Sequence, residues 1–138
     1  MNALHAVSVP TAPSARVPMV GLLRVVLLVQ ATVGLGLAVV LSMVARESSA
    51  DAETPIRFAA GGAFLFAIFA AVASRGARRR RRWAWTMAAM LQVALAMGTG
   101  IAVIAAAWHP AYLGSFALGG AVMLVLSSAT VRRELGQA

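Results

Sequence analysis

The stretch R-G-A-R-R-R-R-R-W-A-W, residues 75–85, places six arginines and two tryptophans near the middle of an otherwise apolar chain. Consecutive charges of this density cross a bilayer only at high cost, whereas tryptophan prefers the headgroup level of a membrane. We therefore expect this arginine segment to be a cytoplasmic loop that runs into a membrane surface. It divides the chain into two apolar halves, each long enough for a pair of membrane-spanning helices.

The composition excludes several classes of protein. Of the 138 residues, 61% are hydrophobic, against about half in a soluble domain, so we expect an integral membrane protein. The chain has no cysteine, which excludes disulfides, thiol catalysis and cysteine-ligated metals. Its two histidines, His5 and His109, have no carboxylate near them in the sequence, so we expect no metal and no other cofactor.

Uncharged stretches on both sides of the arginine segment predict four helices. Residues 25–45 carry no charge, and a helix of that length rises about 30 Å, the thickness of a hydrocarbon core. Such a run is also longer than the roughly 7 to 15 apolar residues of a signal peptide. The expected fold class is all-α, a polytopic membrane protein with four transmembrane helices arranged as two hairpins. The helices are predicted at residues 20–45, 55–74, 83–108 and 111–131.

The segments outside these spans are short. Residues 1–17 contain prolines among small residues and are predicted to be a disordered cytoplasmic tail before a transmembrane domain at 18–135, with a cytoplasmic end at 136–138. Charged residues between 46 and 57 predict a polar loop, in which Thr54 caps the second helix and Pro55 occupies its first turn.

The distribution of arginine predicts the orientation. Outside the spans, nine arginines lie on the side of the arginine segment and two, Arg46 and Arg57, on the other side. Because cytoplasmic loops carry the excess of positive charge, we expect both termini in the cytoplasm and the chain in a bacterial inner membrane.

The arginine segment itself has two main interpretations. Its charges fix the topology, or they also contact anionic lipid or a partner protein, since a polybasic segment is attracted to anionic headgroups by about 1 kcal/mol per charge. Because the segment lies beside membrane spans, lipid is nearer to it than nucleic acid is, and we expect no nucleic-acid partner. The candidate residues are Arg75, Arg78, Arg79, Arg80, Arg81 and Arg82.

Two glutamines interrupt the apolar spans. Gln30 shares a helix face with small residues, and so does Gln92, so we expect both amides to make interhelical polar contacts, with a substrate site as the alternative. Aligning the two glutamines also suggests that one half of the chain repeats the other. Small residues at steps of four predict helix packing at Ala59, Ala63, Ala67, Ala71, Ala94, Gly98 and Ala102.

Some of these motifs resemble known families. With its glutamine-containing first and third helices, its arginine-rich loop before W-A-W and its terminal V-R-R-E-L, the chain is similar to small four-span membrane proteins of high-GC bacteria whose function is uncharacterised. Residues 27–30 (L-L-V-Q), the Gly61-Gly62 pair and the Arg-Trp entry to the third helix resemble ATP synthase protein I. That resemblance implies an assembly factor, but the family's Pro-Asn after the glycines and its charged third span are missing here.

No span contains Asp, Glu, Lys or His, which disfavours a pump or an ion-coupled exchanger. We therefore expect a non-enzymatic accessory or assembly component that contacts other membrane proteins or anionic lipid. The alternative is a small uncoupled transporter or channel subunit that acts as a homo-oligomer.

Overall fold

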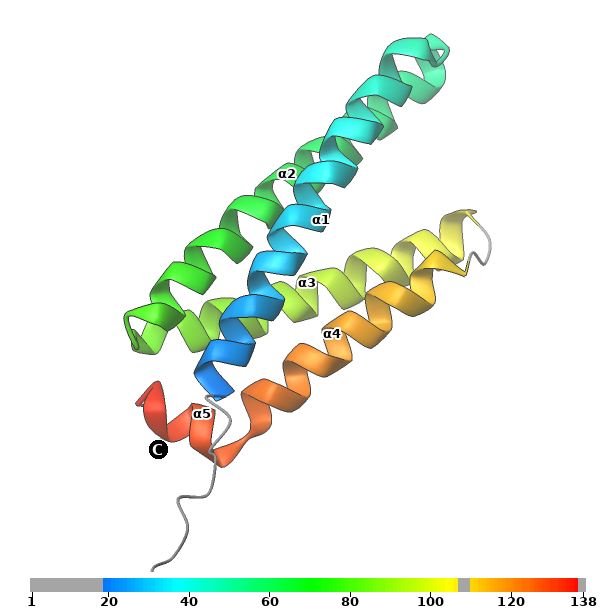
Figure 1. Cartoon of the computed structure of the whole chain (residues 1–138). Coiled ribbons are helices and arrows are strands. Elements are labelled where there is room, and N and C mark those ends of the chain that lie inside the picture. The colour runs from blue at the N-terminus through cyan, green and yellow to red at the C-terminus, as the bar shows by residue number, and fades with distance from the viewer. Residues whose placement is uncertain (1–18, 107–109, 137–138) are drawn as a thin grey trace, which may run out of the picture.

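The computed structural model of the chain describes residues 19–106 and 110–136, and within them every regular element is a helix (Figure 1). The all-α fold class is thus confirmed for this part of the chain. The described part of the chain does not include the predicted tail at residues 1–17, His109 or residues 137–138. The helices are α1 (Met19–Glu47), α2 (Ala50–Arg78), α3 (Arg82–Ala106), α4 (Ala111–Ser127) and α5 (Ala129–Glu134).

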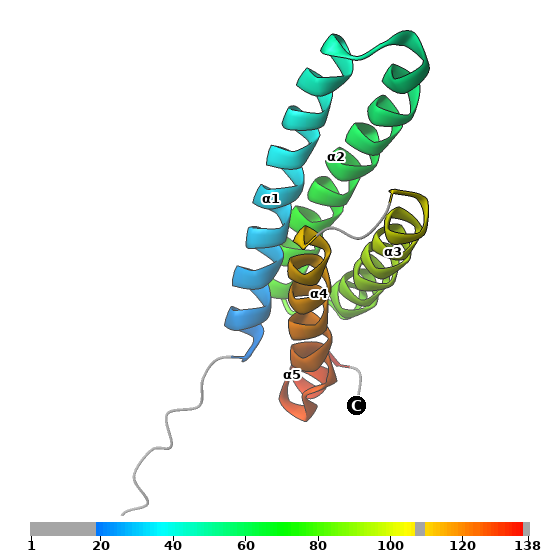
Figure 2. The same cartoon turned by 90° about the vertical axis from the view of Figure 1, so that its right-hand side faces the viewer.

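The helices form two antiparallel pairs that meet at one end. α1 lies beside α2 along most of its length, and α3 lies beside α4 (Figures 1 and 2). The pairs come together where α2 turns into α3 and where α5 lies, and they diverge toward the opposite end (Figures 1 and 2). We call the meeting end the arginine end and the other the open end.

Within residues 19–106 and 110–136, three helices are long and apolar enough to cross a membrane, which is the character of a multi-pass membrane protein. They are Met19–Glu47, Ala50–Arg78 and the Arg82–Ile104 part of α3, whereas the apolar part of α4, Tyr112–Ser127, is shorter. The predicted fourth helix at 111–131 is wrong at its end, because the backbone at Ser128 is extended (ψ 134°). The Ser128 hydroxyl accepts a 3.3 Å hydrogen bond from the Val131 N–H and so begins α5 as a separate helix.

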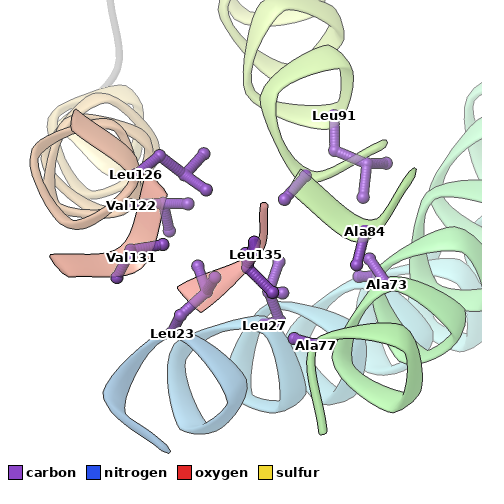
Figure 3. Close-up of a cluster of buried hydrophobic side chains, with 12 residues drawn as sticks. Leu23, Leu27, Ala73, Ala77, Ala84, Leu91, Val122, Leu126, Val131 and Leu135 are labelled. Atoms are coloured by element: carbon purple, nitrogen blue, oxygen red, sulfur yellow. The ribbon is translucent and has the colours of Figure 1, made fainter. Parts of the chain in front are cut away.

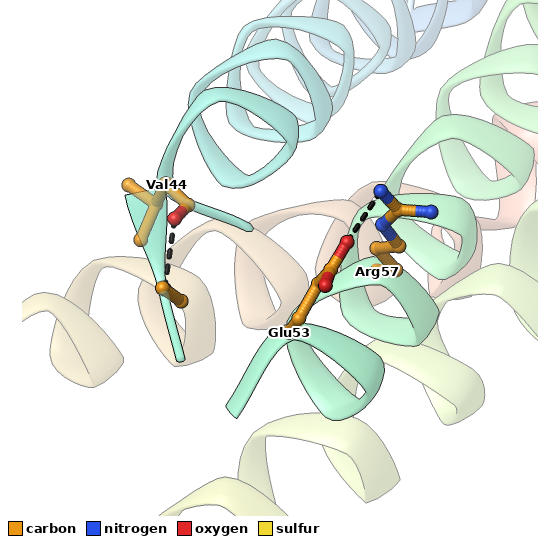
Figure 4. A network of polar contacts seen from close by, with 4 residues as sticks. Val44, Glu53 and Arg57 are labelled. Carbon is orange, nitrogen blue, oxygen red and sulfur yellow. Dashed lines mark hydrogen bonds and ion pairs between the residues drawn. The ribbon is translucent and has the colours of Figure 1, made fainter. Parts of the chain in front are cut away.

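The polar loop predicted between the first two helices is wrong in extent. Only residues 48–49 connect α1 to α2, Ser49 occupies the N-cap position instead of Thr54, and Pro55 lies inside the helix. The charged residues are compatible with helix here because Asp51 and Glu53 lie in the first turn, where the helix dipole favours negative charge. Glu53 also forms an ion pair with Arg57 one turn later (Figure 4).

The arginine segment is likewise mostly helical, although the predicted helices at 55–74 and 83–108 leave residues 75–82 as a loop. α2 continues to Arg78 and α3 begins at Arg82, so residues 79–81 form the whole turn. Arginine is a good helix former, and the helix therefore continues through the charges. The chain reverses at Arg80, whose φ of 51° is left-handed.

The core lies at the arginine end. Leu23 and Leu27 of α1 belong to one cluster with alanines of α2 and α3, and Val131 of α5 and its C-cap residue Leu135 are fully buried in the same cluster (Figure 3). Because alanine side chains are small, the helix backbones approach closely, which is a main source of helix association in lipid. α5 therefore belongs to the core, although the sequence analysis assigns it no role.

Gly76, in the last turn of α2, lies against Trp83 of α3. A Cβ atom added to Gly76 would lie 2.5 Å from Cη2 of Trp83, so the indole ring rests directly on the glycine. By contrast, a Cβ atom added to Gly61, on the same helix, would meet nothing within 4 Å.

We predict that Gly76→Ala lowers the free energy of unfolding by about 1 kcal/mol or more, because the added methyl group overpacks against Trp83. Gly61→Ala is the matched control: it gives the same gain in helix propensity without a clash, so it should leave stability unchanged or raise it. Thermal unfolding in mild detergent compares the two variants. Equal stabilisation by both would contradict the close packing of Trp83 on Gly76.

Candidate functional site

Gln30 and Gln92 contact each other in the interior of the molecule. Nε2 of Gln30 donates to Oε1 of Gln92 over 3.0 Å, and Nε2 of Gln92 donates to Oε1 of Gln30 over 3.2 Å. Only 2% and 4% of the two residues are exposed. The sequence analysis expects an interhelical contact for each amide, but only the structure makes them partners.

This amide pair links α1 to α3 at the edge of the core that faces the open end. Leu27 and Leu91, which precede the two glutamines by three residues and by one, both belong to the core. On α1 the face of Gln30 stays buried through Gly34, whose added Cβ would lie 3.3 Å from the Ala63 carbonyl oxygen of α2. On α3, Ala96, one turn after Gln92, is exposed.

The chemistry of the pair favours structure over reaction. A neutral amide neither gains nor loses a proton at physiological pH, and each glutamine here satisfies the donor and the acceptor of the other. Gln92 also donates to the Ala88 carbonyl oxygen over 3.4 Å, whereas Gln30 has hydrogen bonds to Gln92 only among the described residues.

The six arginines of the arginine segment separate into two groups. Arg75, Arg78 and Arg79 line a pocket of about 530 Å³ between α1 and α2, which Arg24 of α1 also lines. We call this the arginine pocket. The sequence does not indicate that Arg24 lies beside the arginine segment, because the spacing along one helix does not reveal the neighbouring helix.

Of the other three arginines, Arg80 and Arg82 lie near the end of α5. Nη2 of Arg80 is 3.9 Å from Oε2 of Glu134, and Arg81 is exposed. A Cβ atom added to Gly136 would lie 2.7 Å from Nε of Arg82, so that side chain passes over the end of α5.

The predicted small-residue stripes coincide only in part with the buried faces. On α2, Ala67 is buried and Ala63 half-buried, while Ala59 and Ala71 are exposed. A step of four residues drifts by about 40° around a helix of 3.6 residues per turn, so the stripe leaves the contact face. On α3, Ala94 and Gly98 are exposed and Ala102 is half-buried; packing by these three residues stays a prediction that concerns contacts outside the chain.

Trp85 makes a contact that the sequence analysis does not foresee. Its indole Nε1 donates to the Leu126 carbonyl oxygen over 3.1 Å. Leu126 lies in the last turn of α4, where carbonyl groups lack partners within the helix, so the tryptophan caps this end. The indole thus joins α3 to α4 at the arginine end.

Among the described residues, no three His, Cys, Asp or Glu side chains come together as metal ligands could. No protein-family model matches the chain, and no curated protein or solved structure is significantly similar to it. The amide pair and the arginine pocket are therefore the candidate sites that the described structure offers.

We predict unequal losses from the two single changes Gln30→Leu and Gln92→Leu. Gln92→Leu removes the donor and the acceptor that the buried Gln30 uses, and it should lower the free energy of unfolding by about 1–3 kcal/mol. Gln30→Leu leaves Gln92 its hydrogen bond to the Ala88 carbonyl oxygen, so its loss should be smaller. Because the amides share one contact, the double change should cost less than the sum of the single changes. Unfolding in mixed micelles measures the losses.

Thr99→Val provides the control for these substitutions. Oγ1 of Thr99 donates over 2.8 Å to Leu95 of its own helix, so its loss breaks no contact between helices. Its effect on stability should therefore be small. Strictly additive losses at Gln30 and Gln92 would mean that the two amides do not depend on each other.

Proposed function

We propose that the chain is a non-enzymatic accessory or assembly component of a bacterial inner membrane, where it contacts other membrane proteins. The observation that carries this proposal is the reciprocal pairing of Gln30 with Gln92. The two glutamines buried among the apolar spans hydrogen-bond to each other, which favours a structural role for the amides over a solute site. An assembly role is also what the resemblance to ATP synthase protein I implies.

The proposed topology has four spans in two hairpins, with both termini in the cytoplasm. The segregation of charge supports it: Arg132 and Arg133 lie at the arginine end with the arginine segment, whereas Glu47, Asp51 and Glu53 lie at the open end. α4 has 17 residues and rises about 25 Å as a helix, near the lower limit of a span. Its antiparallel position beside α3 supports its assignment as the fourth span.

One observation favours the alternative of an uncoupled transporter or channel subunit. A groove of about 290 Å³ between α3 and α4 is lined by Gln92, Thr99 and Ser115 together with apolar residues. In a homo-oligomer such a groove becomes part of a solute path through the membrane only if a second copy of the chain covers its open side.

We predict that single cysteines at Ser49 and Arg81 report opposite sides of the membrane. Both residues are exposed, the chain has no native cysteine, and they lie at opposite ends of α2. An impermeant thiol reagent should label Ser49→Cys in intact cells, and Arg81→Cys only after permeabilisation. Labelling of Arg81→Cys alone in intact cells would reverse the orientation, and labelling of both would refute a second span.

We predict that the chain purified in mild detergent carries a stoichiometric foreign membrane protein. Size-exclusion chromatography with mass spectrometry identifies the components, and the partner should persist when Arg81→Gln removes a charge outside the arginine pocket. A homo-oligomer that releases solute from liposomes would instead establish the transporter alternative. In that case Gln92→Leu should abolish release while the oligomer persists.

A further inference from the structure

The arginine pocket is formed by one face of each of two helices. Arg24 and Leu28 lie one turn apart at the start of α1, and Ala71, Arg75 and Arg78 follow at steps of three and four residues at the end of α2. Side chains at such steps share a helix face, so the pocket is a feature of the packed pair of helices and not of a loop.

The positive charge in this pocket has no counter-charge within the described chain. The ion pairs among the described residues join Arg57 to Glu53 and Arg80 to Glu134. Neither pair involves an arginine of the pocket. Three of the four acidic residues of the chain lie at the open end, far along the helices. Four guanidinium groups around one pocket repel each other, and a bound anion would relieve that repulsion.

Ser74 adds a hydrogen-bonding group to the pocket wall. Only 2% of this residue is exposed, and its hydroxyl has no hydrogen bond within the described chain. Among the described residues no fully buried side-chain polar atom lacks a hydrogen-bond partner, so this hydroxyl is open to the pocket, where an anion would accept a hydrogen bond from it. This observation is independent of the charge and points to the same kind of ligand.

The pocket also has an apolar side. Leu28, which is 42% exposed, and Ala71 line its wall toward the middle of the helices, one turn from Arg24 and Arg75. A ligand that fits both parts has a phosphate and a hydrocarbon chain. We propose that the arginine pocket binds one anionic glycerophospholipid, whose phosphate contacts the four guanidinium groups and Ser74 and whose acyl chain lies over Leu28 and Ala71.

Guanidinium groups suit this role because they bind phosphate oxygens through two parallel hydrogen bonds. A built pocket differs from a diffuse attraction of the whole arginine segment to the membrane. Diffuse attraction depends on the number of charges near the surface, whereas the pocket depends on which arginines are present. The inference rests on the proposed membrane placement but not on a protein partner, so the partner experiment can fail while this site stands.

The test is native mass spectrometry of the full-length chain in detergent, titrated with dioleoyl phosphatidylglycerol or with zwitterionic dioleoyl phosphatidylethanolamine. The pocket variant is Arg24→Gln with Arg75→Gln, and the control is Arg81→Gln with Arg133→Gln, which removes the same charge from exposed positions. The pocket variant should bind phosphatidylglycerol roughly tenfold or more weakly than the natural chain, because it loses two guanidinium groups that contact the phosphate directly. The control should differ by less than about threefold, and phosphatidylethanolamine should bind weakly throughout.

Equal losses in the two double variants would overturn the pocket and leave only diffuse attraction. Inorganic phosphate added as a competitor separates the two sources of the phosphate group: displacement of lipid by equimolar phosphate would overturn the lipid assignment in favour of a free anion. Thermal unfolding is the second measurement, because a ligand that binds only the folded chain stabilises it. Phosphatidylglycerol should raise the unfolding midpoint of the natural chain and the control, and leave that of the pocket variant unchanged.

Discussion

Close packing of small side chains at the arginine end is the interaction on which the rest of the structure depends. In lipid, apolar burial alone does not drive helices together, so association depends on how closely backbones approach. Ala70, Ala73 and Ala77 of α2 and Ala84 and Ala88 of α3 are almost fully buried, and they let Leu23 and Leu27 fill the space between the pairs. The two helix pairs are held at this end and diverge beyond it.

The polar contacts of the interior lie around this core and give it a unique arrangement. The Gln30 and Gln92 amides join α1 to α3 at the edge of the core that faces the open end, and the Trp85 indole joins α3 to the end of α4. Such hydrogen bonds are worth about 0.6–2 kcal/mol each in membranes, which is too little to hold a bundle but enough to select one pairing of faces. The short helix α5 then closes the arginine end, where Leu135 is buried and Glu134 approaches Arg80.

The same packing divides the arginines by role. Positive charge along the whole arginine segment is what an orientation signal needs, and any of its residues can contribute. Helix pairing adds a distinction that charge counting lacks, because it places Arg24 of α1 beside Arg75 and Arg78 of α2 and directs Arg82 to the end of α5. A chain with the same charges in a flexible loop would attract anionic lipid without binding a particular molecule of it.

Composition and the length of uncharged stretches are local properties, so they are enough to predict the all-α class, the long apolar helices and the arginines between the two halves of the chain. The predicted helix ends are wrong at residues 46–57, 75–82 and 128, because charged residues continue a helix as readily as they end one and because Ser128 ends a helix without glycine or proline. Three contacts follow from the arrangement of the helices in space and not from local sequence. The two amides are partners, Trp83 rests on Gly76, and Arg24 lines the arginine pocket. These depend on which helix faces meet, and that choice is made by the packing of small residues across the whole molecule.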